Sequence, residues 1–166
     1  MALSALLLCR WTSLRPGVVA AAVCASAAQP AFALNQQALS QLLQPADLAL
    51  MMASICTAVD QSFPPDLRGQ HGSVPEYAGH MKDAVSVGLA PEQIGAVFRQ
   101  SADAAKAAAL KEVRSLTALD ESNARARMRD WCATRVKPLL EKFMRTYDEH
   151  PDEFANQVAR AKTDGN

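Results

Sequence analysis

An imidazole and two carboxylates lie at helical spacing near the middle of the chain. Glu76, His80 and Asp83 are four and three residues apart, so a helix would carry them on one face. His71, in the segment just before, could supply a further ligand. These four residues are our candidate metal ligands, because imidazole and carboxylate groups bind zinc and related ions. A solvated helix face with balanced charge is the simpler interpretation, since ligands from one helix usually need another from elsewhere.

Two cysteines far apart in the sequence, Cys56 and Cys132, could form a disulfide. In an oxidising compartment such a pair is expected to form a disulfide. The bond would close a loop of about 76 residues and add roughly 4 kcal/mol to stability by chain-entropy arguments. Two buried thiols are the alternative. The chain contains no Cys-x-x-Cys, so neither a thioredoxin-type site nor covalent haem attachment is indicated.

Basic and aromatic side chains give a third set of candidates, for binding a partner. Arg68 and His71 fall in a polar segment without periodicity, and such loops often carry binding surfaces. A second group lies further along the chain, where an arginine could stack on the indole: Arg125, Arg129, Trp131 and Arg135. A plain connector and a solvated helix face are the alternatives, because the arginines alternate and would spread around a helix.

Methionines and one histidine could instead bind haem, as thioether and imidazole groups do in some helical proteins. The residues in question are Met51, Met52, Met81, Met128, Met144 and His150. Most of these methionines fall on or beside apolar faces, which favours ordinary core packing. We therefore expect no cofactor.

The first 33 residues are typical of a cleavable targeting sequence. Arg10 and Arg15 precede an apolar run over 17–27, and Ala31-Phe32-Ala33 has the small residues that signal peptidase accepts. The run is too short to span a bilayer, which needs about 20 apolar residues. We expect an exported protein that begins at Leu34, periplasmic or secreted, with an organelle transit peptide as the alternative.

The segment 34–166 that would remain makes one domain. It keeps 15 of the 17 basic residues and all 17 acidic ones, giving a formal charge of −2. This balance disfavours a nucleic-acid partner, which requires a positive field. No second apolar run approaches membrane-spanning length, so we expect no stable membrane anchor after cleavage.

Apolar periodicity predicts helices near 46–62, 74–87, 91–117 and 121–148, with short extra helices at both ends. Pro45 should interrupt the short helix over 35–44, before the helix over 46–62 begins, and Pro138 should kink or break the helix over 121–148. Ser73 and Glu76 have the spacing of a capping box, Gly88 should end the second helix, and Asp120 should cap the fourth. No alternating run is long enough to indicate a strand. The expected fold is an all-α irregular bundle, with one disulfide across its core.

The sequence predicts function less well than it predicts fold. It contains no metalloprotease, serine-hydrolase, P-loop, dinucleotide, EF-hand or zinc-finger motif, which makes an enzyme the weaker hypothesis. The favoured hypothesis is a small exported module that binds another protein or a small ligand. The alternatives are a carrier of a metal, haem or apolar ligand, and a hydrolase with His71 or His80 as its base.

Overall fold

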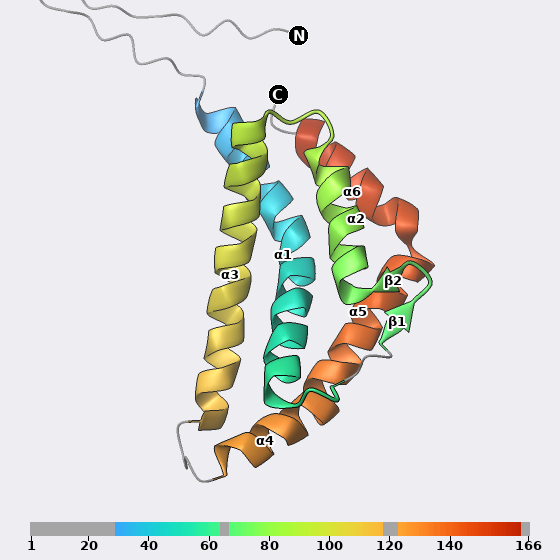
Figure 1. The fold of residues 1–166 in the computed structure, drawn as a ribbon. Coiled ribbons are helices and arrows are strands. Elements are labelled where there is room, and N and C mark those ends of the chain that lie inside the picture. The colour runs from blue at the N-terminus through green and yellow to red at the C-terminus, as the bar shows by residue number, and fades with distance from the viewer. Residues whose placement is uncertain (1–28, 64–66, 118–122, 164–166) are drawn as a thin grey trace, which may run out of the picture.

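The computed structural model describes residues 29–63, 67–117 and 123–163, with side chains described from Asn35 onward. The chain runs down along α1 (Gln29–Val59), up along α2 (Val74–Ser86) and down along α3 (Pro91–Thr117) (Figure 1). It returns upward through α4 (Ala124–Trp131), a π-helical segment (Cys132–Val136), α5 (Lys137–Glu149) and α6 (Pro151–Thr163). The predicted all-α bundle is therefore confirmed. The predicted leader over 1–33 lies largely outside the described residues.

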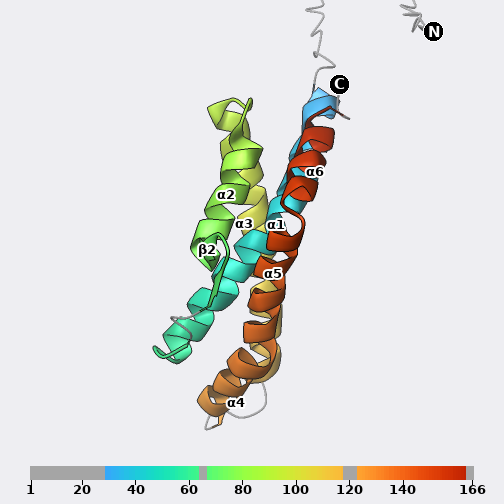
Figure 2. The same cartoon turned by 90° about the vertical axis from the view of Figure 1, so that its right-hand side faces the viewer.

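Helix α1 forms the centre of the bundle. Figure 2 shows α1 with α2 and α3 on one side and α5 and α6 on the other. Its most extensive neighbour is α3, and it also packs against α2, α5 and α6. A helix in contact with so many others must be apolar on several faces, which explains its low proportion of charged residues.

The prediction that Pro45 interrupts this helix is wrong. Pro45 lies inside α1, so the expected short helix before it and the expected helix over 46–62 are one element. Leu43, Ala46 and Ala49 on either side are fully buried. Their packing outweighs the loss of one backbone donor at the proline.

The merged helix also overturns the expectation that no apolar run after the leader approaches membrane-spanning length. Within the described residues, the stretch Asn35–Val59 is long and apolar enough to cross a bilayer by length and composition alone. The central helix of a bundle meets the same criterion, because its residues face neighbours on several sides.

The helix predicted over 121–148 continues past Pro138 without a break, through a π-helical segment just before the proline. The Lys137 N–H donates to the carbonyl of Cys132, five residues back, and Pro138 lies in the first turn of α5. A π-helical turn at this point accommodates a residue that cannot donate its own hydrogen bond. Asp120, the predicted cap, lies outside the described residues, and Asn123 precedes α4 instead.

The segment before α2 contains a small hairpin that the sequence does not predict. Strands β1 (Arg68–Gly69) and β2 (Gly72–Ser73) pair antiparallel. Gly72 has a φ of 107°, a conformation that favours glycine. Strands of two residues are too short for an alternating pattern, so periodicity could not reveal them.

Buried side chains form two clusters. The disulfide cluster surrounds the lower half of α1, and its members are Ala49, Met52, Cys56, Val74, Tyr77, Ala109, Met128, Trp131, Cys132, Val136, Leu140 and Met144. The terminal cluster lies at the end where α1 begins and α6 finishes, and its members are Leu39, Leu43, Ala46, Ala78, Met81, Val85, Val97, Phe154 and Val158. The predicted Cys56–Cys132 disulfide is confirmed, with a Cα–Cα distance of 5.6 Å.

Candidate functional site

The hairpin is fastened to α5 by a single carboxylate. Asp148 accepts hydrogen bonds from the Tyr77 hydroxyl (2.5 Å), from His71 Nδ1 (2.8 Å) and from the backbone N–H of Gln70 (3.1 Å). The Tyr77 hydroxyl in turn accepts from the backbone N–H of His71 at 3.1 Å. A Cβ atom at Gly69 would overlap this hydroxyl, so only glycine lets the strand approach so closely.

These contacts determine the charge of the groups involved. Burial opposes ionisation of Asp148, but the hydrogen bonds from Tyr77, His71 and Gln70 outweigh it and lower its pKa. Burial, and then the hydrogen bond to Asp148, raises the pKa of Tyr77. The site therefore holds an ionised carboxylate that accepts from a neutral phenol. Asp148 is ionised and can only accept, so Nδ1 of His71 carries the proton.

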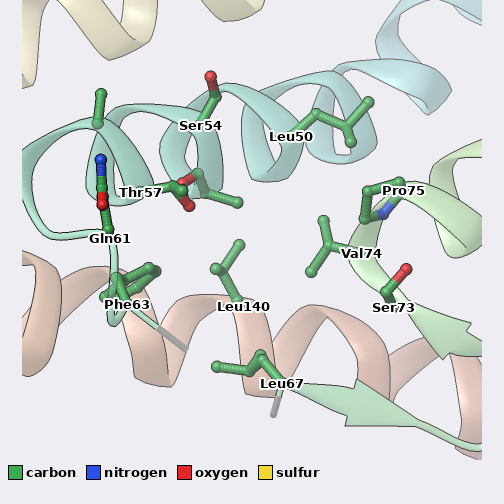
Figure 3. A pocket seen from close by; sticks show the side chains of 12 residues that line it. Leu50, Ser54, Thr57, Gln61, Phe63, Leu67, Ser73, Val74, Pro75 and Leu140 are labelled. Carbon is green, nitrogen blue, oxygen red and sulfur yellow. The ribbon is translucent and has the colours of Figure 1, made fainter. Parts of the chain in front are cut away.

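A pocket of about 650 Å³ lies beside the hairpin, between α1, α2 and α5. Figure 3 shows Leu140 projecting from α5 toward α1, with Phe63 and Val74 on opposite sides of it. Leu50 and Leu67 add to the apolar lining, together with smaller side chains of α1 and α2. We call this cavity the Leu140 pocket. Its volume falls within the range of about 300–1,000 Å³ that is usual for small-molecule sites.

The polar side chains of the Leu140 pocket carry no formal charge. Ser54, Thr57 and Gln61 approach from α1 and the turn that follows it, and Ser73 approaches from the hairpin (Figure 3). Among the described residues, no Asp, Glu, Lys, Arg or His lines this cavity. The pocket is therefore suited to an apolar group with a neutral hydrogen-bonding atom.

A second, more charged depression of about 550 Å³ lies between α1, α5 and α6. We call it the Phe143 groove. Phe143, Tyr147, Phe154 and Leu139 form part of its lining, and Lys142, His150 and Glu153 bring charge or polarity to its edge. Pro45 also lines this groove. Because proline has no N–H, the Gln41 carbonyl here lacks its usual α-helical donor.

The structure disperses most of the predicted metal ligands. Glu76 turns back to accept from the N–H and hydroxyl of Ser73 at 2.6 and 2.7 Å, which confirms the capping interaction. Asp83 is exposed on α2. His71 and His80 do come together, with ring centroids 6.1 Å apart. Within the described part of the chain, no group of three or more His, Cys, Asp or Glu is arranged to hold a metal ion.

The predicted partner-binding residues are also dispersed. Arg68 lies on the hairpin, and Arg125, Arg129 and Arg135 are exposed along α4 and the π-helical segment. Trp131 is only 6% exposed and belongs to the disulfide cluster, so its indole is not available to a partner. The cation–π contact in the described structure is between Lys82 and Phe98, not between Arg135 and Trp131.

The methionines are core residues. Met52, Met128 and Met144 are buried in the disulfide cluster, and Met51 packs against it. Met81 belongs to the terminal cluster and lines the Phe143 groove together with His150. The set proposed for haem ligation is therefore divided between two regions, and one methionine shares a cavity with the histidine.

Sequence reasoning did not identify Asp148 or assign Tyr77 a polar role. Asp148 is 77 residues from His71 and 71 from Tyr77, so no local spacing connects them. The sequence does place Tyr77 on an apolar helix face, and a buried tyrosine hydroxyl usually needs a hydrogen-bond partner. That requirement could have indicated a polar contact here. No protein-family model, curated protein or solved structure matches this chain.

Proposed function

We propose that the protein is an exported binding module, and that its Leu140 pocket receives an uncharged apolar group. The observation that carries this proposal is the cavity itself, about 650 Å³ with an apolar lining and neutral polar groups at its edge. The group could be a small ligand or an apolar side chain of another protein. Either would be bound through burial of apolar surface, with one or two hydrogen bonds that set its orientation.

The walls of the pocket are held in place before a ligand arrives. Leu140 belongs to the disulfide cluster, in which Cys56 and Cys132 join α1 to the segment before α5. Ser73 ends the hairpin and Val74 follows it, and Asp148 ties the hairpin to α5. A cavity with fixed walls loses less conformational entropy on binding, which supports recognition rather than a purely structural role.

Export is supported by two independent features. The N-terminal sequence has the charge, apolar run and small residues of a signal peptide. Cys56 and Cys132 are paired, and disulfides form and persist mainly in oxidising compartments. The intact mass of protein recovered from its producing cell tests this proposal. Loss of residues 1–33 and of two hydrogen atoms is expected, and a full-length chain with two free thiols would contradict it.

Binding in the Leu140 pocket can be tested with the neutral fluorescent probe Nile red. We expect a saturable fluorescence increase with the wild-type protein. Ser54→Trp should weaken it at least about tenfold, because an indole at this exposed α1 position would fill the cavity. Ala107→Trp adds the same side chain at an exposed position of α3, away from both cavities, and should leave the titration unchanged.

The same variants distinguish a protein partner from a small ligand. Wild type and Ala107→Trp should capture the same protein from an extract of the native compartment, whereas Ser54→Trp should not. If Nile red binds but no protein is captured, a small ligand is favoured. Equal Nile red affinity in Ser54→Trp and Ala107→Trp would contradict binding in this pocket.

A further inference from the structure

Two of the three histidines of this chain meet at the hairpin. His71 lies in the turn between β1 and β2, and His80 lies two turns into α2. Because the hairpin folds back beside α2, their ring centroids are 6.1 Å apart with planes inclined by 74°. Both residues are exposed, and the His71 side chain has 41% of its surface accessible.

Asp148 fixes which nitrogen of His71 is available. The carboxylate only accepts, so the 2.8 Å contact places the ring proton on Nδ1. In the neutral imidazole the lone pair is then on Nε2. A carboxylate that orients a histidine in this way is the usual support for an imidazole that binds a metal. Tyr77 and Gln70 hold the carboxylate itself, so the arrangement exists without a ligand.

From this juxtaposition we propose that His71 and His80 bind one divalent transition-metal ion, with water in the remaining coordination positions. Imidazole pairs favour Cu²⁺, Ni²⁺ and Zn²⁺ over Mg²⁺ and Ca²⁺, and Cu²⁺ binds most tightly of the series. A metal–nitrogen bond of about 2.0 Å sets the centroids of two ligated rings roughly 5–6 Å apart. The observed centroid separation of 6.1 Å is close to that spacing, and both side chains are exposed.

The surrounding charges include groups of both signs. Asp148 contacts His71 directly, and Glu76, one turn before His80 on α2, is also ionised. The electrostatic effects on Glu76 come from both Arg68 and His80, which places the Arg68 guanidinium near the same surface. The two carboxylates favour a cation and Arg68 opposes it. With two protein ligands and one opposing cation, the affinity should be lower than in a site with three or four protein ligands.

Titration of the purified protein with Cu²⁺ alone, followed by calorimetry and electron paramagnetic resonance, tests the site. Wild type should bind one ion saturably, with a spectrum that shows coupling to two imidazole nitrogens. His80→Ala removes an exposed side chain and should weaken binding at least about tenfold, leaving coupling to one nitrogen. His150→Ala is the matched control, because it removes the remaining histidine, which follows the C-terminal end of α5 and lines the Phe143 groove, and it should change neither measurement.

Asp148→Asn tests the positioning role separately, since it retains both imidazoles. It should weaken Cu²⁺ binding by about 10–100-fold, as loss of an orienting carboxylate does. Circular dichroism of each variant distinguishes a lost site from a lost fold. Wild type without saturable Cu²⁺ binding, or with the same affinity as a folded His80→Ala variant, would overturn the proposal. Nile red binding is independent of this outcome.

Discussion

The two ends of α1 are held in different ways. Around its lower half, Cys56 is covalently joined to Cys132. Asp148 ties the hairpin to α5 by accepting hydrogen bonds from the Tyr77 hydroxyl and from His71 Nδ1. Around its upper half the terminal cluster packs without a described covalent cross-link, and polar contacts add to it. Asn35 donates to the Lys162 carbonyl at 3.4 Å, and Lys162 Nζ donates to the carbonyls of Ala84 (3.2 Å) and Val87 (2.6 Å).

An ion pair between the buried Asp47 and the partly exposed Lys82 strengthens the upper half. Asp47, 6% exposed, lies 2.7 Å from Lys82 Nζ and accepts from the Ser101 hydroxyl at 2.6 Å, which joins α1, α2 and α3. The difference indicates that the lower half is preorganised by a covalent cross-link, as a binding site requires, whereas the upper half depends on apolar packing and polar contacts. The following predictions are ordered by the expected loss of stability.

Removing the disulfide should have the largest effect. Cys56→Ala/Cys132→Ala should lower the free energy of unfolding by about 4 kcal/mol, because the unfolded chain regains the freedom of a 76-residue loop. Urea unfolding measures the change. Hydrogen exchange should quicken most in the lower half of α1. Wild type treated with reductant serves as the comparison, and a loss below about 1 kcal/mol in both would contradict the assigned role.

Breaking the ion pair should have the next largest effect. Lys82→Met should cost about 3 kcal/mol, because it leaves the buried Asp47 carboxylate without its cation. Asp47→Asn/Lys82→Met removes both charges and should recover part of that loss. A thermodynamic cycle by urea unfolding gives the coupling. Equal stability of Lys82→Met and the double variant would contradict the claim that an unpaired, buried Asp47 carboxylate causes the loss, and Asp47→Asn alone completes the cycle.

Loss of the Tyr77 hydroxyl should destabilise the lower half by about 2 kcal/mol, because Asp148 and the His71 N–H each lose a partner. Tyr77→Phe is the required variant, with urea unfolding as the measurement. Tyr147→Phe is the matched control, since the described structure gives the Tyr147 hydroxyl no hydrogen bond. It should change stability by less than about 0.5 kcal/mol.

The stability of wild type and that of Tyr77→Phe should also depend differently on pH. The pKa of Asp148 is lowered in the folded protein, so its stabilising effect is present above the unfolded value of about 3.9. The effect is lost as the pH falls through the lower, folded value. Tyr77→Phe removes one of the donors that lower this pKa. The stability gap between wild type and Tyr77→Phe should therefore narrow between pH 7 and pH 3, and a gap that widens would contradict the assignment.

Local signals in the sequence predicted much of the fold. The bounds of α3 match the prediction, Gly88 follows α2 with a φ of 77°, and Glu76 caps that helix. The pairing of Cys56 with Cys132 was also predicted, from the expected oxidising compartment and because only these two cysteines remain after the expected removal of the leader. The helix bounds and caps depend on residues close in sequence, so local patterns can predict them. The disulfide depends on only two cysteines within the described residues, which leaves one possible pairing there.

What sequence reasoning missed depends on tertiary contacts. Pro45 should end a helix by local rules, but its neighbours are buried on several sides and α1 continues. Asp148 gave no signal, because its partners are more than 70 residues away. The Leu140 pocket combines residues from α1, the hairpin, α2 and α5, and no spacing in the sequence connects them.

The most direct test of the account compares the two cavities in one experiment. Nile red is titrated into protein with labelled leucine and valine methyl groups, and their NMR shifts are followed. Saturable shifts should concentrate on Leu50, Val74 and Leu140, with Leu42, Leu48 and Leu139 of the Phe143 groove unmoved. Shifts confined to the groove, or no saturable shift anywhere, would contradict the proposal that the cross-linked end of the molecule binds the ligand.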